Sequence, residues 1–204
     1  MHIAVTGNIG AGKTTLTTML AKHYNWEAQF EDVDKNPYLE DFYKDMSQWS
    51  FALQIYFLGS RFRQVKEIRE SGKSVIQDRT IYEDAYIFAE NLSEMNLLSE
   101  RDFNNYNTVF NLMKSFVSAP DLLIYLKAEI PTLVKQIAKR GRDYEAEMSI
   151  DYLQKLNKKY DKWINGYSEG KLLVIDVNGL DFVSNPEDFG FVLERIDAEL
   201  NGLF

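Results

Sequence analysis

The sequence contains no cysteine, only four prolines and no long hydrophobic run among its 204 residues. Without cysteine the chain can form neither a disulfide framework nor a thiolate metal site. The scarcity of proline leaves long stretches free to form helices. No apolar run approaches the length of a membrane span, and the N-terminus lacks a charged leader followed by an apolar stretch. We therefore expect a soluble cytoplasmic protein with no membrane partner.

Basic residues are outnumbered as well. Lys and Arg total 23 against 31 Asp and Glu, which gives a net charge of −8. This acidic balance argues against a nucleic-acid partner, because such a partner favours a basic surface. The length and the 45% of hydrophobic residues indicate a globular chain with a sizeable core. No repeat or linker divides the sequence, so we expect one domain over residues 1–204.

Short apolar runs alternate with longer helical patterns along the chain. The runs predict strands at 2–6, 74–77, 121–126 and 172–176, with a weaker strand near 27–31. The helical patterns cover 13–23, 47–70, 82–91, 100–117, 131–140 and 149–165. This alternation predicts an α/β fold in which helices cover both faces of a five-stranded parallel sheet. Ligands are then expected at the carboxyl ends of the strands.

The first apolar run leads into residues 7–14, which match the phosphate-binding pattern G-x-x-x-x-G-K-[ST]. Glycines let consecutive backbone N–H groups turn inward around an anion, and the next helix directs its positive end there. Lys13 can reach the terminal phosphates, and the Thr14 hydroxyl can bind Mg²⁺. The predicted ATP-binding residues are Gly7, Asn8, Ile9, Gly10, Ala11, Gly12, Lys13, Thr14 and Thr15.

Two other interpretations of this loop fit less well. A glycine-rich turn without a ligand would not need Lys-Thr at the required offset. The dinucleotide fingerprint G-x-G-x-x-G is not matched, because the glycines here fall as G-x-x-G-x-G.

Charged residues also follow the second and third predicted strands. Glu31 follows the weak strand, and Asp78 and Arg79 follow the strand at 74–77. A nucleotide held in the loop needs an acceptor hydroxyl, a group that deprotonates it, and cations for the developing charge. Glu31 fits the base, Arg79 a cationic clamp and Asp78 a Mg²⁺ ligand. Taken alone, Glu31 is more often a solvated loop acid, and Asp78 and Arg79 an ordinary ion pair. Together with the phosphate-binding loop, the functional interpretation is favoured.

A basic cluster, Lys139-Arg140-Gly141-Arg142, closes the helical pattern at 131–140. One interpretation is favourable placement of cations at a helix end, with Gly141 as its cap. The other is an Arg-rich lid over about 136–148 that closes Arg140 and Arg142 over ATP phosphates. The presence of the phosphate-binding loop favours the lid.

A third cluster lies on one helical face. Gln54, Phe57 and Arg61 are spaced i, i+3 and i+7, so an aromatic plane lies beside an amide and a guanidinium. Such a group could hold a nucleobase by stacking and edge hydrogen bonds. By spacing alone, the wet edge of a core helix explains the same pattern better.

Four segments together resemble the deoxynucleoside kinase family within the P-loop kinases. They are residues 36–45, Gln54 in a Trp-Ser-Phe-x-x-Gln context, Asp78-Arg79-Thr80 and Arg140-Gly141-Arg142. The resemblance covers nearly the whole chain and is strongest to bacterial deoxyadenosine/deoxyguanosine kinases. It implies a P-loop kinase fold, a homodimer, and Mg²⁺-dependent transfer from ATP to the 5′-hydroxyl of a deoxynucleoside.

The resemblance also implies roles for individual residues. Glu31 is similar to the family's base, and Arg79 to the arginine that holds that base and the hydroxyl. Tyr43 and Glu145 match residues that bond the sugar 3′-hydroxyl. Gln54 matches the amide that reads the base edge, and Arg140 and Arg142 resemble lid arginines. Phe57 is expected to contact the base, and Arg61 and Asp84 match a pair that contacts it in purine-accepting members.

Three positions depart from the family pattern. The family often has Glu-Arg-Ser where this chain has Asp78-Arg79-Thr80. Many members carry proline after the base glutamate, where Asp32 stands here. Gln136 occupies the place of a further lid arginine found in some members.

We expect a purine deoxynucleoside as substrate, with deoxyadenosine favoured and deoxyguanosine next. A nucleoside monophosphate kinase of the thymidylate-kinase type is the main alternative, but its acceptor phosphate would be better served by cations than by Glu31. A nucleotide-binding switch protein is a further alternative. Its D-x-x-G motif would be Asp176-Val177-Asn178-Gly179, far too late in the chain, and no N-K-x-D motif is present.

Overall fold

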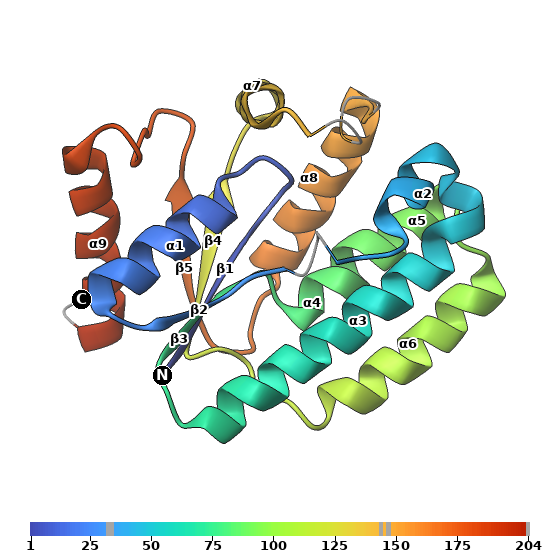
Figure 1. Ribbon diagram of the computed structural model, residues 1–204, viewed down its shortest axis with the longest axis horizontal. Helices are drawn as coiled ribbons and strands as arrows, with labels where there is room; N and C mark the ends of the chain where they lie inside the picture. Colours follow the sequence, from blue (N-terminus) through green and yellow to red (C-terminus); the bar gives the residue numbers. More distant parts are fainter. Residues whose placement is uncertain (32–34, 143–144, 146–147, 203–204) are drawn as a thin grey trace.

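The computed structural model describes residues 1–31, 35–142, 145 and 148–202. Five parallel strands form one sheet in the order β2-β3-β1-β4-β5. Figure 1 shows them side by side at the centre of the molecule. The strands are β1 (His2–Gly7), β2 (Glu27–Gln29), β3 (Val75–Asp78), β4 (Leu122–Lys127) and β5 (Lys171–Asp176). The predicted five-stranded parallel α/β architecture is confirmed.

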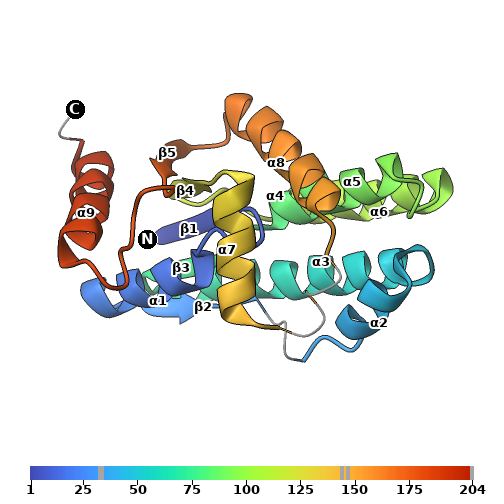
Figure 2. The same cartoon turned by 90° about the horizontal axis from the view of Figure 1, so that it is seen from above.

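Helices pack on both faces of this sheet, as expected for parallel strands. They are α1 (Lys13–Tyr24), α2 (Leu39–Lys44), α3 (Met46–Ser71), α4 (Ile81–Glu83), the π-helical segment η1 (Asp84–Ala89), α5 (Glu90–Glu94), α6 (Glu100–Lys114), α7 (Ile130–Arg140), α8 (Ile150–Asn165) and α9 (Pro186–Asn201). Figures 1 and 2 show α1 and α9 toward one side of the sheet, and α8 with the α3–α6 helices toward the other.

Alternating side chains of the strands belong to different core clusters. Ile3 and Val5 of β1 pack in the cluster that includes α1 and α9. Ala4, between them, packs with α8 on the opposite face. This alternation is the two-residue period of a strand that is buried on both faces. A third cluster lies among α3, η1 and α6, away from the strands.

The structure differs from the sequence expectations at several elements. β2 has three residues, so Phe30 and Glu31 lie beyond the strand. The helix expected at 82–91 contains the π-helical turns of η1, and α2 and α9 were not predicted. The helix expected at 100–117 ends at Lys114. Across the ranges that the structure describes, no helix is both long and apolar enough to cross a membrane.

Candidate active site

The phosphate-binding loop has the backbone conformation that its glycines predict. Gly10 and Gly12 have φ angles of 85° and 92°, which side chains with a Cβ rarely adopt. A Cβ on Gly10 would lie 2.8 Å from the carbonyl oxygen of Leu133, so α7 also restricts this position. α1 begins at Lys13, directly after Gly12. Because Gly12 has no side chain to cap the helix, the first N–H groups of α1 can bind an anion.

Side chains hold this loop in place. The Asn8 Oδ1 accepts from the backbone N–H of Ile9 at 2.7 Å, and the Asn8 amide donates to Asn157 Oδ1 at 2.6 Å. Lys13 donates to the backbone oxygen of Asn8 at 2.9 Å. Burial and the neighbouring Arg79 lower the pKa of Lys13 to about 7. The contact between Asn8 and Asn157 anchors the loop to α8, although the motif alone does not indicate Asn157.

Thr14 and Asp78 lie together at the carboxyl end of β3, as predicted. The Thr14 hydroxyl donates to Asp78 Oδ2 at 2.5 Å. The other carboxylate oxygen, Asp78 Oδ1, is buried and has no hydrogen-bond partner among the described residues. A hydroxyl beside a carboxylate with an unused buried oxygen fits a hard cation such as Mg²⁺.

Glu31 lies beyond the end of β2, surrounded by cations. Its Oε1 accepts from Arg61 Nη2 at 2.7 Å and lies 3.4 Å from Arg79 Nε. Gln64 of α3 holds the preceding residue in place by donating to the Phe30 carbonyl at 2.6 Å. Burial alone would raise the pKa of Glu31, but Arg79, Arg61, Lys13 and Arg142 together lower it. The carboxylate is therefore ionised and able to accept a proton.

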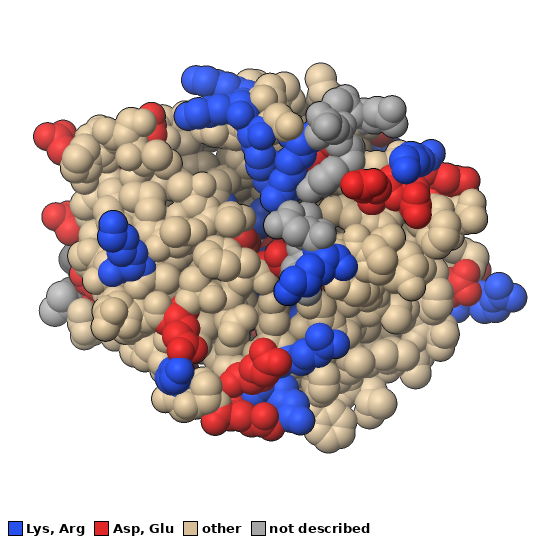
Figure 3. All heavy atoms as spheres, viewed as in Figure 1, with Lys and Arg blue, Asp and Glu red and all other residues tan. Residues whose placement is uncertain are grey.

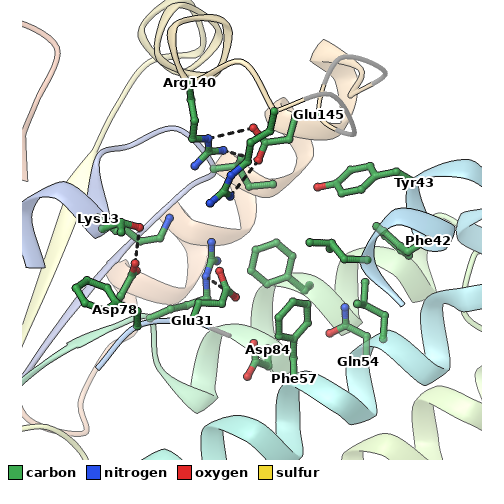
Figure 4. Close-up of a pocket in the computed structure, with 18 of the residues that line it drawn as sticks. Lys13, Glu31, Phe42, Tyr43, Gln54, Phe57, Asp78, Asp84, Arg140 and Glu145 are labelled. Atoms are coloured by element: carbon green, nitrogen blue, oxygen red, sulfur yellow. Dashed lines mark hydrogen bonds and ion pairs between the residues drawn. The ribbon is translucent and has the colours of Figure 1, made fainter. Parts of the chain in front are cut away.

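These residues line a cavity of about 370 Å³. Figure 3 shows basic side chains gathered at a hollow in the middle of one face, below α7. The residues lining the cavity are Ile9, Lys13, Thr14, Thr18, Phe30, Glu31, Leu39, Phe42, Tyr43, Leu53, Gln54, Phe57, Asp78, Arg79, Asp84, Phe88, Arg140, Arg142, Glu145 and Tyr152. In Figure 4 the phosphate-loop side chains lie at one end, and Gln54 and Tyr43 lie at the other.

The far end of the cavity is apolar with a few polar groups. Phe57 lines it together with Gln54, which is 3% exposed. Gln54 Oε1 is buried and makes no hydrogen bond within the part of the chain that the structure describes. An unused amide oxygen beside an aromatic ring is suited to the edge of a nucleobase. Of the three residues that the spacing placed on one helical face, Gln54 and Phe57 line the cavity and Arg61 does not.

Arg61 and Asp84 also meet, although they come from different helices. The Nε of Arg61 lies 3.6 Å from Asp84 Oδ2. Asp84 lines the cavity, whereas Arg61 is 1% exposed and contacts Glu31 and Asp84 without lining the cavity itself. Burial raises the pKa of Asp84 to about 7, against the opposing effect of Arg61. The pairing was expected; the contact between Arg61 and Glu31 was not.

The basic cluster at the end of α7 also reaches the cavity. Arg140 donates to both carboxylate oxygens of Glu145, at 3.1 and 2.5 Å. Arg142 lies 3.7 Å from the same carboxylate. Gly141 follows α7 with a left-handed φ of 65°, so the helix-cap interpretation also holds. Of the predicted lid at 136–148, residues 143–144 and 146–147 lie outside the described residues.

The chain is similar to known proteins over nearly its whole length. The family model for deoxynucleoside kinases matches residues 3–201 of the chain. The chain belongs to the deoxynucleoside kinase family. It is therefore an enzyme that phosphorylates deoxynucleosides, and the monophosphate-kinase and switch-protein alternatives are set aside.

Several proteins are similar to nearly the whole of this chain. The deoxyadenosine kinase of Dictyostelium discoideum is 42% identical over 202 residues, covering 99% of this chain and 80% of that protein. The deoxyadenosine/deoxycytidine kinase of Bacillus subtilis is 37% identical over 201 residues, covering 98% and 93%. The structure of deoxyadenosine kinase from M. mycoides with bound dATP superposes with a TM-score of 0.85 at 31% identity, covering 97% and 99%.

Sequence reasoning for this kinase missed part of the pocket wall. Phe42, Phe88 and Tyr152 line the cavity and were not singled out. Phe88 lies four residues after Asp84, a spacing that could have indicated a shared face. Tyr152 lies in α8, far from the motifs in sequence, and only the fold brings it to the site.

Proposed function

We propose that this kinase transfers the γ-phosphoryl group of ATP to the 5′-hydroxyl of a purine deoxynucleoside, with deoxyadenosine preferred. The observation that carries the proposal is an ionised carboxylate, Glu31, in a cavity that joins a phosphate-binding loop to an aromatic end. Lys13, Arg61 and Arg79 surround Glu31, and their charges favour the carboxylate form. Such a carboxylate can take the proton of a neutral hydroxyl, whereas it would repel an acceptor phosphate.

The donor phosphates would bind along the loop. Its backbone N–H groups and Lys13 would hold the phosphates, and the negative phosphates would favour the charged form of Lys13. Arg140 and Arg142 would neutralise the charge that develops during transfer.

Thr14 and Asp78 would hold Mg²⁺. Their hydroxyl and unused carboxylate oxygen fit its preference for a few protein oxygens together with phosphates and waters. Among the described residues no group of three or more His, Asp or Glu forms a separate metal site, which agrees with a metal held largely by the nucleotide. When bound, Mg²⁺ would supply positive charge to the phosphate oxygens.

The acceptor would extend from Glu31 to the aromatic end of the cavity. Tyr43 and Glu145 would bond the sugar 3′-hydroxyl, and Arg79 would hold Glu31 and the 5′-hydroxyl. Gln54 would bond the base edge while Phe57 packs against the base. Asp84, supported by Arg61, would contribute to the choice of a purine.

A coupled assay tests this function. The enzyme is given Mg-ATP with each of four deoxynucleosides and, separately, with their monophosphates. We expect the highest kcat/KM with deoxyadenosine and slower turnover with deoxyguanosine and deoxycytidine. Turnover restricted to monophosphates would overturn the proposal, and a pyrimidine as best substrate would overturn the purine preference alone.

We also propose that the enzyme is a homodimer that uses the end of α6. Leu112 and Phe116 are 62% and 64% exposed there, and burying such side chains favours association. Light scattering should give twice the chain mass, and Leu112→Glu with Phe116→Glu should give a monomer. Val183→Glu, at another exposed apolar side chain, is the matched control. A monomeric wild type would refute the proposal.

A further inference from the structure

Arg79 is a buried arginine with an unusual backbone. Its φ is 72°, and only 5% of the residue is exposed. The backbone N–H of Arg79 donates to the Val5 carbonyl of β1 at 2.9 Å, which fixes the turn at the end of β3. The Nε side of its guanidinium faces Glu31, and its Cζ lies 4.7 Å from the ring centroid of Phe88. A side chain on such a turn needs partners to direct it, because the φ angle alone does not.

The opposite side of the guanidinium contacts two residues outside the catalytic set. Arg79 Nη1 donates to the Tyr160 hydroxyl at 3.0 Å. That hydroxyl donates to Glu83 Oε1 at 2.9 Å, and Glu83 Oε1 also lies 3.5 Å from Arg79 Nη1. Neither Tyr160 nor Glu83 lines the cavity. Both are 0% exposed, and the hydrogen bond and ion pair above connect them to the cavity-lining Arg79.

Glu83 is itself fixed by the turn that carries Arg79. Its Oε2 accepts from the backbone N–H of Thr80 at 2.7 Å, and Thr80 and Glu83 form the capping box of α4. One oxygen of this carboxylate is thus used by the backbone, and the other is left for Tyr160 and Arg79. Because both of its oxygens accept hydrogen bonds, the buried Glu83 carboxylate is held in one position.

Tyr160 is fixed from the other side of the molecule. It belongs to α8, 81 residues from Arg79 in sequence, and stacks on Tyr125 of β4 with ring centroids 5.8 Å apart. Burial and Glu83 raise the pKa of Tyr160 well above its ordinary value, so the hydroxyl keeps its proton. Its one proton goes to Glu83, and its oxygen is left to accept from Arg79.

We propose that Tyr160 and Glu83 are positioning residues that direct Arg79 toward Glu31 and keep its charge compensated during phosphoryl transfer. The proposal rests on the proposed role of Glu31 as the base. When the 5′-O–H bond breaks, the proton passes to the Glu31 carboxylate, which becomes neutral. Arg79 then loses the counter-charge of Glu31 and keeps that of Glu83, to which it also points through Nη1. The cation can therefore stay in place beside the reacting oxygen.

Tyr160→Phe removes one hydroxyl and keeps the ring that stacks on Tyr125. Arg79 then lacks its hydrogen-bond acceptor and can turn toward Glu83, away from Glu31. We expect kcat to fall about tenfold, while KM for ATP stays within about twofold. Tyr125→Phe is the matched control, because it removes a hydroxyl from the stacked ring and leaves the hydrogen bonds among Arg79, Tyr160 and Glu83 in place. We expect it to leave kcat unchanged.

A double-mutant cycle with Arg79→Lys separates positioning from a structural role. Lysine keeps the charge but lacks the forked geometry that Tyr160 directs. If Tyr160 acts through Arg79, then Tyr160→Phe should have almost no further effect on kcat in the Arg79→Lys background. Equal fold losses in both backgrounds would overturn the proposal, as would an unchanged kcat in Tyr160→Phe.

Glu83→Gln provides a second route should Tyr160→Phe fold poorly. It preserves the shape of the side chain but removes the charge, and we expect a kcat loss at least as large. In the Arg79→Lys background the loss should be smaller but not absent, because lysine keeps the charge that Glu83 compensates and lacks only the fork. Melting curves of all variants confirm that each is folded. Glu31→Gln distinguishes the two proposals. A normal kcat in that variant refutes the base, whereas a low kcat with independent effects at 160 and 79 refutes the positioning residues alone.

Discussion

Glu31 is an acid whose chemistry is decided by its neighbours. Two arginines contact its Oε1, and the residue lies beyond the end of the shortest strand of the sheet. Because the surrounding cations outweigh burial, its pKa is lowered and the carboxylate stays ionised. Its place in the cavity beside the phosphate-binding loop is what supports the proposed role as a general base over that of a solvated loop acid.

Replacing Glu31 tests this role directly. Glu31→Gln keeps the shape of the side chain, but the amide cannot accept the hydroxyl proton. We expect kcat to fall ~10²–10⁴-fold with a much smaller change in deoxynucleoside binding. Steady-state kinetics and equilibrium binding provide the measurement. Glu27→Gln, an exposed acid in β2, is the control and should behave like wild type.

Asp84 should make the stability of the protein depend on pH. Burial raises its pKa to about 7 in the folded protein, whereas in the unfolded chain a carboxyl titrates near pH 4. Between these two pKa values the Asp84 carboxyl is ionised in the unfolded chain but still protonated in the folded protein. Raising the pH therefore lowers the free energy of unfolding. Asp84→Asn removes this penalty. We expect the variant to gain stability relative to wild type from pH 5 to pH 7, and the gain to level off above pH 7.

Urea unfolding at pH 5, 6, 7 and 8 measures that difference. Asp151→Asn, at an exposed position of α8, gives the baseline for loss of a surface carboxylate. A gain that does not change with pH would show that Asp84 is not held with a raised pKa.

Among the elements, α7 brings the basic cluster to the cavity through Arg140. It is amphipathic, with Leu133 buried against the core, and it ends in Lys139 and Arg140. The same helix end thus has Gly141 as its cap and Arg140 in the lining of the cavity. The two interpretations that the sequence left open are compatible, because Gly141 caps the helix while Arg140 and Arg142 line the cavity.

Two variants at this helix end separate the interpretations. Arg140→Ala should lower the single-turnover transfer rate about tenfold or more, because it removes a phosphate-directed cation and the partner of Glu145. Lys139→Ala removes an exposed cation from the same last turn, and Lys139 does not line the cavity. It should affect the helix end equally but leave the transfer rate unchanged. Equal effects of both variants on the transfer rate would show that the basic cluster acts only through its charge at the helix end.

Elements were predicted best where a buried periodic pattern runs over several residues. The strands of the central sheet and α8 followed from such patterns. α2 has six residues and one buried side chain, Phe42, so it is too short to show a helical period. The π-helical turns of η1 change the spacing of side chains around Asp84, and a pattern based on 3.6 residues per turn does not contain that change.

At the scale of the whole molecule, the site depends on contacts between distant segments. The sequence identified Glu31, Arg79 and the loop because each follows a strand, and parallel strands end at the same edge. It did not identify Tyr160 or Asn157 as residues that support the site. Both belong to α8, and they contact Arg79 and Asn8, which are far away in the sequence. Such contacts have no local signature. They also tie the helical layer to the sheet.

The contacts between the helices and the sheet bear on the prediction that residues 1–204 form one domain. The helical cluster around α3, η1 and α6 is separate from the clusters on the sheet, so it could in principle unfold alone. However, both ends of α3 connect to strands, through the segment after β2 and directly into β3. Trp163 also packs against the helical cluster and one sheet cluster together. We therefore expect the chain to unfold as one cooperative unit.

The three tryptophans of the chain allow a direct test. Trp26 packs against the sheet core, whereas Trp49 packs in the helical cluster. One variant keeps only Trp26, with Trp49→Phe and Trp163→Phe; the other keeps only Trp49, with Trp26→Phe and Trp163→Phe. Each is unfolded in urea at one protein concentration and followed by tryptophan fluorescence and far-UV circular dichroism. Since the connections around α3 join both regions, the two probes should give the same midpoint within each variant. A Trp49 midpoint below that of circular dichroism, with a Trp26 midpoint above it, would instead divide the chain into a helical and a sheet domain.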